Sequence, residues 1–288
     1  MTKSWMKQSR KQVYDFLDRS LPPGNGRIKD AARHSAVNNK AHFWRPLLTI
    51  ASGKAYDIEF DKILTYSLTP ELFHTASLIM DDLPSMDNAD FRRGKPSCHK
   101  EFNIATTDLC FYYLIEKART IIQDGDLTDK SKIDILKVST DTSFKLIEGQ
   151  KRDLYDTSSN NNLVFDEVIS LYQQKTGAMF AYAISIGGIL GNALEDELKE
   201  LNYLGESIGV AYQIKDDLLD VCGDEKEIGK PIHQDENKTT VVNLLGIDKS
   251  RELIEKYKDK IKNSISYLKN KNRDVSHIED FVSVMLEI

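Results

Sequence analysis

The sequence predicts an all-α protein, a single domain over residues 1–288 built as a bundle of about ten or more helices. Almost every segment carries apolar residues three and four positions apart, the spacing that lines one face of an α-helix. No alternating apolar and polar run with hairpin turns stands out, and no short internal repeat is present. The only compositionally biased patch, residues 158–162, is typical of a loop.

The first half of the chain opens with an amphipathic helix over residues 7–21, which a Pro-Pro-Gly run ends. Helical spacing follows over 46–55 and over 60–82, and the second of these runs directly into a cluster of aspartates. Residues 103–123 and 130–156 are each long enough to cross the domain, at about 1.5 Å of rise per residue.

The second half continues with a long helix over residues 165–190. The longest apolar stretch, 177–194, contains glycines and polar residues, so we expect a buried core helix there and not a membrane span. Residues 195–221 run into a second cluster of aspartates. The Lys- and Asp-rich stretch 249–273 predicts a solvated pair of helices.

Charge and cysteine usage narrow the class of protein. The net charge of −6 argues against a partner nucleic acid, for which a basic surface is expected. Cys98, Cys110 and Cys222 have no metal-type spacing and form no disulfide framework, which fits a reducing compartment. The first residues lack the apolar run of a signal peptide. We therefore expect a cytoplasmic protein without an integral membrane segment.

The two aspartate clusters are the most informative feature of the chain. Each lies in an apolar stretch, where a carboxylate stripped of water is costly unless a partner neutralises it. Three acids in one cluster cannot neutralise one another, so we expect the clusters to face each other across a central cavity and to share divalent cations. Mg²⁺ takes oxygen ligands and binds together with substrate phosphates. The six candidate metal ligands are Asp81, Asp82, Asp87, Asp216, Asp217 and Asp220.

The second cluster is an ordinary helical pair. Asp216 and Asp220 lie one turn apart and about 40° from each other around the helix axis, so both can bind one metal. Asp217 points roughly 100° away from Asp216. A merely solvated acidic face would also explain three acids, but the apolar neighbours Leu218 and Leu219 argue against it.

The first cluster needs a break in its helix. Asp81 and Asp87 would lie about 240° apart on an unbroken helix, and therefore on different faces. Pro84 stands between them and cannot continue an undisturbed helix. The sequence therefore predicts a helix that ends in a metal-binding elbow, with Asp87 brought back beside Asp81.

Basic residues accompany both clusters. Arg92 and Arg93 follow the first cluster closely, and guanidinium groups suit the oxygens of a diphosphate that Mg²⁺ bridges. Three lysines accompany the second cluster in the sequence: Lys175 precedes it, and Lys230 and Lys238 follow it. Singly each is typical of a surface lysine; together they predict a site for two polyanionic groups.

With these motifs the chain resembles the trans-polyprenyl diphosphate synthases over about residues 40 to 246. The paired aspartate motifs, in this order and with these surroundings, carry the resemblance. Lesser motifs agree with it: His74-Thr75-Ala76-Ser77, Gly149-Gln150-x2-Asp153-Leu154, Lys175-Thr176-Gly177 and Gly229-Lys230-Pro231.

The resemblance implies an isoprenoid synthase-like fold, a homodimer and a short-chain prenyltransferase. Such an enzyme condenses isopentenyl diphosphate with dimethylallyl, geranyl or farnesyl diphosphate, giving farnesyl or geranylgeranyl diphosphate. Three Mg²⁺ ions would draw electrons from the allylic diphosphate until its C–O bond ionises. The implied catalytic residues are Asp81, Asp87, Asp216, Lys175 and Gln213. The implied substrate-binding residues are Arg45, His74, Arg92, Arg93, Lys175, Thr176, Gln213, Lys230 and Lys238, of which Arg45, His74 and Arg93 would bind isopentenyl diphosphate.

One segment departs from the family's pattern, Gly-Gly-Lys-Arg-x-Arg-Pro. Arg45 and the following proline match it, but His42 stands at the position of the lysine and Phe43 at that of the next arginine. Lys40 can replace the lysine only if two extra residues bulge outward. Product length also depends on local residues. Ala76 is small where an aromatic favours C15, so we expect C20. The next floor of the tunnel is either Phe73 or the aromatic run Phe111, Tyr112 and Tyr113.

Two other functions fit the same sequence. A terpene synthase-like enzyme would ionise one allylic diphosphate without condensing it, which the altered segment before Arg45 permits. A non-catalytic subunit of a prenyl synthase is the second alternative, although such a subunit has no need of buried carboxylates.

Overall fold

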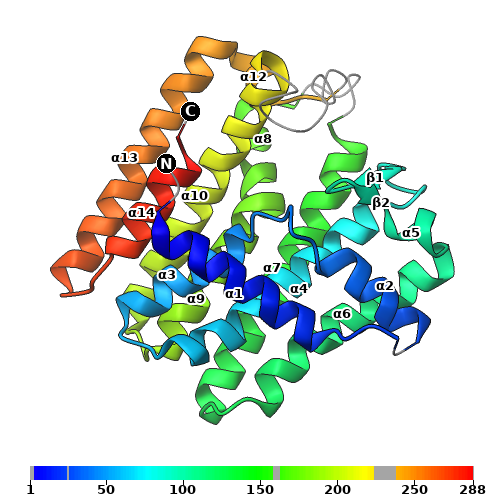
Figure 1. Ribbon diagram of the computed structural model, residues 1–288. Helices are drawn as coiled ribbons and strands as arrows, with labels where there is room; N and C mark the ends of the chain where they lie inside the picture. Colours follow the sequence, from blue (N-terminus) through cyan, green and yellow to red (C-terminus); the bar gives the residue numbers. More distant parts are fainter. Residues whose placement is uncertain (1–2, 25, 158–162, 224–237, 288) are drawn as a thin grey trace.

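The computed structural model describes residues 3–24, 26–157, 163–223 and 238–287, which form a bundle of helices (Figure 1). These residues contain more than ten helices and one short hairpin, so the predicted all-α bundle is confirmed. The first helices are α1 (Ser4–Ser20), α2 (Arg27–Ala36), α3 (Trp44–Ala55) and α4 (Phe60–Asp81). After the hairpin of β1 (Phe91–Arg92) and β2 (Lys95–Pro96) come α5 (Cys98–Glu101), α6 (Ile104–Asp124) and α7 (Asp129–Tyr155). The remaining elements are α8 (Phe165–Tyr172), the π-helix η1 (Gln173–Gly177), α9 (Ala178–Leu190), α10 (Glu195–Cys222), α12 (Val241–Leu245), α13 (Ile247–Asn270) and α14 (Ser276–Met285).

The structure differs from the sequence-based expectation in three elements. Residues 27–36 form a helix that the apolar spacing did not predict, and its buried side chains are small alanines. The expected helix over 165–190 is interrupted by the π-helix η1. The expected pair of helices over 249–273 is wrong: α13 is a single helix, because Ile254, Tyr257 and Ile261 line one buried face and only the opposite face is charged.

Helix α9 lies at the centre of the bundle. All of its residues are buried, as expected for the core helix, and it packs against α3 and α10. The polar residues of α3 that face it are satisfied by its backbone: Thr49 Oγ1 donates to the Ala183 carbonyl at 2.8 Å and Ser52 Oγ to the Ile184 carbonyl at 2.7 Å. These bonds fix α3, and with it Arg45, against the core.

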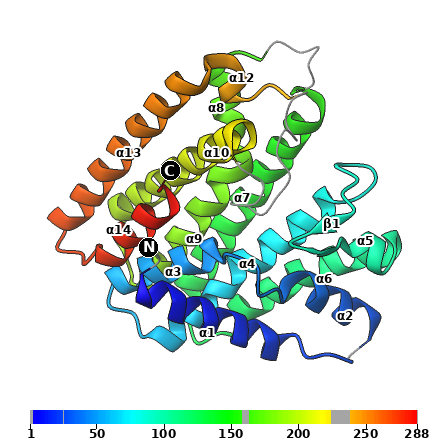
Figure 2. The same cartoon turned by 45° about the horizontal axis from the view of Figure 1, so that its top comes forward.

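The two ends of the chain meet on one side of the molecule. Trp5 Nε1 donates to Asp280 at 3.0 Å, and α1 and α14 lie close together in both views (Figures 1 and 2). Helices α13 and α14 occupy this side, whereas the hairpin and α5 lie at the opposite side. The two aspartate clusters lie at the C-terminal ends of α4 and α10.

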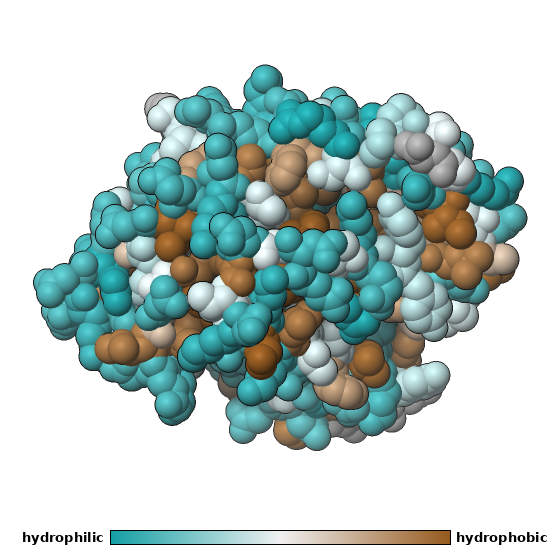
Figure 3. All heavy atoms as spheres, turned by 90° about the horizontal axis from the view of Figure 1, so that it is seen from below, coloured by the Kyte–Doolittle hydropathy of each residue, from teal (hydrophilic) through white to brown (hydrophobic). Residues whose placement is uncertain are grey.

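The surface seen from below is largely hydrophilic, with apolar side chains in several separate patches (Figure 3). Of the helices that the structure describes, none combines the length and the apolar character needed to cross a membrane.

Candidate active site

The first aspartate cluster forms the predicted elbow. Helix α4 ends at Asp81, and the chain then turns so that the Asp87 backbone N–H donates to the Asp81 carbonyl at 2.9 Å. The backbone N–H groups of Met86 and Asn88 both donate to the Leu83 carbonyl, at 2.9 and 3.0 Å, which closes the turn around Pro84. The prediction that Asp87 returns to the side of Asp81 is confirmed.

The surroundings of Asp81 disfavour the charged form of its carboxylate. Burial raises its pKa to about 6; Lys175 opposes this shift, whereas Asp87 and Asp153 add to it because they are negative. A half-buried acid beside two further acids is stabilised in its charged form by any cation that binds among them. Asp87, by contrast, is exposed at the mouth of the elbow.

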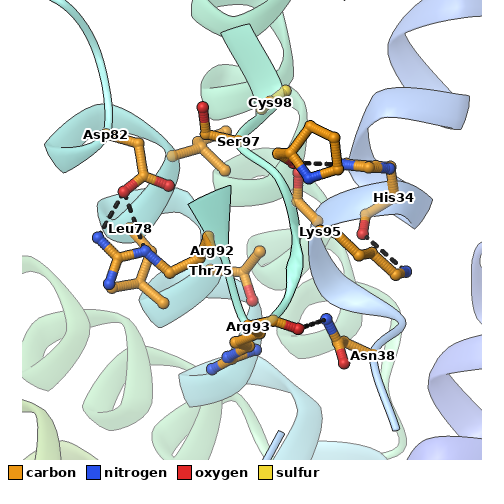
Figure 4. A pocket seen from close by; sticks show the side chains of 13 residues that line it. His34, Asn38, Thr75, Leu78, Asp82, Arg92, Arg93, Lys95, Ser97 and Cys98 are labelled. Carbon is orange, nitrogen blue, oxygen red and sulfur yellow. Dashed lines mark hydrogen bonds and ion pairs between the residues drawn. The ribbon is translucent and has the colours of Figure 1, made fainter. Parts of the chain in front are cut away.

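Asp82 turns away from this group and holds Arg92. Its Oδ1 accepts from Arg92 Nε at 2.9 Å and also from Arg92 Nη2, while its buried Oδ2 has no hydrogen-bond partner among the described residues. Figure 4 shows Arg92 reaching Asp82 from strand β1. Asp82 therefore positions the guanidinium that follows the first cluster.

The side chain of Arg93, in the same hairpin, points toward another acid, Glu71. The turn residues Arg93 and Gly94 have φ values of 51° and 76°, the left-handed pair of a two-residue hairpin turn. A non-glycine residue in this conformation is uncommon and costs free energy, which marks a candidate functional position. From the turn, both Nη atoms of Arg93 approach Glu71 Oε1 at 3.4 Å.

Glu71 belongs to a group with excess positive charge. Arg45 extends over the Phe180 ring, 5.0 Å from its centroid, and its Nε has no hydrogen-bond partner among the described residues. Burial and the nearby arginines hold the pKa of His74 well below its ordinary value, so this imidazole is neutral at pH 7. One buried carboxylate thus faces Arg45 and Arg93, an arrangement that favours an anionic ligand.

Lys175 and Lys238 meet at a single carboxylate. Asp153 Oδ2 accepts from Lys175 Nζ at 2.5 Å and from Lys238 Nζ at 3.4 Å. Although burial raises the pKa of Asp153, these two lysines outweigh it and lower the pKa below its ordinary value. Gly149 permits the approach, because a Cβ there would lie 2.9 Å from the backbone nitrogen of Lys175.

The π-helix joins these lysines to the second aspartate cluster. Thr176 Oγ1 donates to Gln213 Oε1 at 2.8 Å, and Gln213 Nε2 donates to Asp217 Oδ1 at 3.1 Å. The buried Tyr172 hydroxyl donates to the other oxygen of Asp217. Asp217 therefore orients Gln213 and faces protein donors. Short π-helical segments of this kind are frequent at functional sites.

The other acids of the second cluster follow the predicted helical geometry. Asp216 and Asp220 lie on the last turns of α10, with Asp216 half-buried and Asp220 buried. Lys230, which the sequence places in the substrate site, lies outside the described residues. In the part of the chain that the structure describes, no three acidic, histidine or cysteine side chains are close enough to hold a metal by themselves.

The donor set nevertheless fits Mg²⁺. This ion is bound through one or two carboxylates, with waters and substrate phosphates as its other ligands. Asp81 with the exposed Asp87, and Asp216 in the second cluster, supply carboxylates of this kind. Burial and the neighbouring acids Asp87 and Asp153 raise the pKa of Asp81, and a cation bound among these acids would offset that effect.

Sequence reasoning missed Glu71, Asp153 and Tyr172 as site residues. Glu71 is an isolated acid in the apolar part of α4, one turn before His74, and that position was the available signal. Asp153 lies within a motif that the sequence displays, but only the structure shows that it binds both lysines. Nothing in the sequence indicates that Tyr172 reaches Asp217.

A small pocket is lined by Arg92 and Arg93 and is bounded by α2, α4 and the hairpin (Figure 4). Its cations are already engaged: Lys95 Nζ donates to the carbonyls of His34 and Val37 at 3.3 and 3.0 Å, and Arg92 binds Asp82. Asp82 of the first acid cluster also lines this pocket, so the pocket adjoins that cluster.

The polyprenyl synthetase family model matches residues 27–284. Farnesyl diphosphate synthase of Micrococcus luteus is 31% identical over 284 residues, which cover 96% of this chain and 94% of that protein. Geranylgeranyl pyrophosphate synthase 12 of Arabidopsis thaliana is 32% identical, over 88% of this chain and 73% of that protein.

Solved structures agree with these relatives. A geranyltransferase of Helicobacter pylori, complexed with magnesium and isoprenyl diphosphate, superposes with a TM-score of 0.83 at 25% identity, covering 98% of this chain and 95% of that one. Geranyltranstransferase of Thermotoga maritima gives a TM-score of 0.77 at 30% identity, over 97% and 96% of the two chains. The predicted short-chain trans-prenyltransferase is thereby confirmed. On the match to its family model and on its relatives, the chain belongs to the polyprenyl synthetase family.

Proposed function

We propose that this chain condenses isopentenyl diphosphate with dimethylallyl, geranyl or farnesyl diphosphate in the presence of Mg²⁺. One observation carries the proposal: neighbouring arginines of one hairpin serve two different groups of residues. Arg92 lies with Asp82 of the first acid cluster, and Arg93 lies with Glu71. Two cationic subsites that flank one set of acids suit two diphosphates.

The first subsite would bind the allylic diphosphate. Asp81, Asp87 and Asp216 would hold Mg²⁺, for which we propose three ions, with Asp82, Asp217 and Asp220 close by. When bound, the metal supplies Lewis-acid polarisation of the diphosphate oxygens. The chain's own cations, Arg92, Lys175, Lys230 and Lys238, would stabilise the charge that develops on the leaving diphosphate.

The second subsite would bind isopentenyl diphosphate through Arg45, His74 and Arg93. Glu71 balances only part of this charge and holds Arg93 in place. A neutral His74 would act as a hydrogen-bond partner and not as a cation, because its pKa is held far below 6.5. The homoallylic double bond would then lie next to the allylic carbon.

Gln213 and the backbone carbonyls near Lys175 and Thr176 would stabilise the carbocation between the two subsites. Thr176 occupies the acceptor oxygen of Gln213 and Asp217 occupies its amide, so this side chain has a fixed orientation. A preoriented dipole stabilises developing charge without reorganisation during the reaction. The site must also exclude water, because water would quench the cation.

For the product we propose the C20 geranylgeranyl diphosphate over the C15 farnesyl diphosphate. Ala76 is fully buried and small at the fifth position before Asp81, which leaves room for a longer chain. One turn lower, Phe73 packs edge-on against Tyr182 with ring centroids 5.8 Å apart, and this pair would form the floor.

We also propose a single domain, a homodimer and a cytoplasmic location. The homodimer is supported by large apolar side chains that are exposed on α6 and α7, namely Leu109, Tyr112, Ile133, Phe144 and Ile147. A second copy of this chain would remove them from water. Sedimentation of the purified chain tests this assembly: a monomer at micromolar concentration would contradict it.

One assay separates the proposed reaction from its alternatives. Radiolabelled isopentenyl diphosphate is supplied with each allylic diphosphate and Mg²⁺, and the products are sized by chromatography. Extension of the chain supports the condensation. Release of diphosphate with a hydrocarbon or alcohol product would instead indicate a terpene synthase-like enzyme. No turnover in the wild type and in Asp81→Ala alike would indicate a non-catalytic subunit.

A further inference from the structure

The hydroxyl of Tyr172 lies between two segments of the site that are far apart in the sequence. Tyr172 is the last residue of α8, and its ring is buried in the core. The hydroxyl donates to Asp217 Oδ2 on α10 and accepts from the Val241 backbone N–H at 3.1 Å, at the start of α12. A hydroxyl has one proton to donate, so the two bonds are compatible: Asp217 accepts that proton, and a lone pair remains for the amide.

On the α10 side, Tyr172 belongs to a connected set of four side chains. Tyr172 and Thr176 lie four residues apart along the chain, as do Gln213 and Asp217 on α10. Thr176 Oγ1 donates to Gln213 Oε1 at 2.8 Å, and Gln213 Nε2 donates to Asp217 Oδ1 at 3.1 Å. Both oxygens of Asp217 therefore accept from protein donors, and the amide of Gln213 is held at both of its polar atoms.

On the α12 side, Tyr172 holds the segment that carries Lys238. The first N–H groups of a helix have no partner inside it. At the start of α12, Thr240 Oγ1 accepts from the Asn243 N–H at 3.1 Å. The N–H of the fully buried Val241 is instead bound by Tyr172. Asn243 Nδ2 also donates to the Lys238 carbonyl at 2.8 Å, so the backbone of Lys238 is tied to the first turn of α12.

We infer that the Tyr172 hydroxyl is a positioning group that couples the docking of residues 238–241 to the orientation of Gln213, through Asp217. This inference rests on the proposed condensation, in which Lys238 faces the leaving diphosphate and Gln213 faces the carbocation. Hydrogen bonds in such a chain polarise one another, so each strengthens its neighbours. One hydroxyl then keeps the group for the leaving diphosphate and the group for the carbocation in fixed relative positions.

The test compares Tyr172→Phe, which removes only the hydroxyl, with the control Tyr257→Phe. Both tyrosines are 6% exposed, and Tyr257 lies on α13 in the same core cluster. Initial rates with each substrate varied in turn should show kcat about tenfold lower in Tyr172→Phe, the lower end of the cost of losing a residue that orients a functional group. The KM for isopentenyl diphosphate should stay within about twofold of wild type, because Arg45 and Arg93 lie on other elements. The control should keep both values.

Two further measurements separate positioning from support of the fold. Hydrogen exchange at the Val241 amide should be about tenfold faster in Tyr172→Phe, since the amide loses its acceptor. Exchange should also be faster in Asp217→Asn, which weakens the bond that orients the hydroxyl, and this comparison needs no turnover. In kcat, the double variant Tyr172→Phe/Asp217→Asn should lose no more than Asp217→Asn alone, because both changes break the same chain of bonds.

Other results overturn the inference. A normal kcat in Tyr172→Phe with faster exchange at Val241 would mean that the hydroxyl only anchors α12. Losses that multiply in the double variant would mean that Tyr172 and Asp217 act independently. Wild type that binds both diphosphates but forms no condensation product would contradict the proposed function. Exchange at Val241 would then decide the coupling by itself, and an unchanged rate in Asp217→Asn would refute it.

Discussion

The backbone N–H of Asp87 donates to the carbonyl oxygen of Asp81 at 2.9 Å, so the two outer acids of the first cluster lie beside each other. On a straight helix these residues would lie on different faces. The elbow at Pro84 thus brings together two acids that an unbroken helix would hold on different faces. It also places Asp87 at the exposed mouth and Asp81 at the half-buried base.

Asp81→Asn should stabilise the metal-free protein while it abolishes turnover. Burial raises the pKa of Asp81 to about 6, so the folded protein keeps this proton to a higher pH than the unfolded chain. Wild type therefore loses stability as pH rises from about 4 to 6, and above that range it carries the full cost of the buried, ionised Asp81. At pH 7.5 the free energy of unfolding of the variant, measured in urea, should exceed that of wild type by about 1–2 kcal/mol.

The gain from Asp81→Asn should shrink toward pH 4, where both forms are neutral. Asp87→Asn is the matched control: it removes an acid from the same elbow, but an exposed one, and should leave the free energy of unfolding within about 0.5 kcal/mol. A destabilised Asp81→Asn at pH 7.5 would show that its charge is already compensated inside the protein.

Arg92→Ala and Arg93→Ala should impair different substrates. Arg93→Ala should raise the KM for isopentenyl diphosphate about tenfold and that for the allylic diphosphate much less, since Arg93 lies with Glu71 and Arg45. Arg92→Ala should show the opposite preference, because Arg92 lies with Asp82. Initial rates with each substrate varied in turn give both values. Equal effects of each variant on both substrates would contradict two separate subsites.

The helices of this fold were largely predictable, because apolar spacing alone locates α4, α7 and α10 to within a few residues. The elbow was predictable as well, since Pro84 permits few continuations. Interactions between distant segments were not: that Asp153 binds both Lys175 and Lys238 depends on how α7 packs against the π-helix. The single helix α13 was not predicted either, because its apolar stripe is narrow and its lysines and aspartates dominate the composition.

Lys175→Met should slow the chemical step. Lys175 lies between Asp153 and Asp81, so its loss removes one cation for the leaving diphosphate and leaves two acids less compensated. We expect kcat to fall about 10²-fold, the usual cost of removing one preorganised stabilising group. Single-turnover experiments separate this effect from binding. Lys175→Arg, which keeps the charge, should lose much less; an equal loss would indicate that only packing matters here.

Product length should respond to Ala76 and Phe73 in opposite directions. Ala76→Phe fills a fully buried position of α4 and should shorten the main product by one or two C5 units. Phe73→Leu removes the ring that packs on Tyr182 and should lengthen it, at a cost in stability of about 1–2 kcal/mol. Chromatography of the dephosphorylated products measures both. Unchanged lengths in both variants would place the floor elsewhere.

An ion pair between Glu197 and Arg273 stabilises the fold far from the acid clusters. Glu197, fully buried at the start of α10, accepts from Arg273 Nε at 2.7 Å and Nη2 at 3.0 Å, and Arg273 also lies over the Tyr56 ring at 4.4 Å. This pair joins α10 to the loop after α13. Glu197→Gln leaves Arg273 without its charged partner and should lower the free energy of unfolding at pH 7 by about 2 kcal/mol.

The pH dependence identifies the cause. The hydrogen bond from Arg273 lowers the pKa of Glu197 below 4.5, so the stabilisation is complete above that pH and is lost as pH falls through the folded value. Urea unfolding should therefore show wild type losing more stability than Glu197→Gln between pH 7 and pH 3. Because roughly 28 Å of helix separates Glu197 from Asp216, kcat should not change. Equal losses in both proteins would mean that packing, not charge, holds this joint.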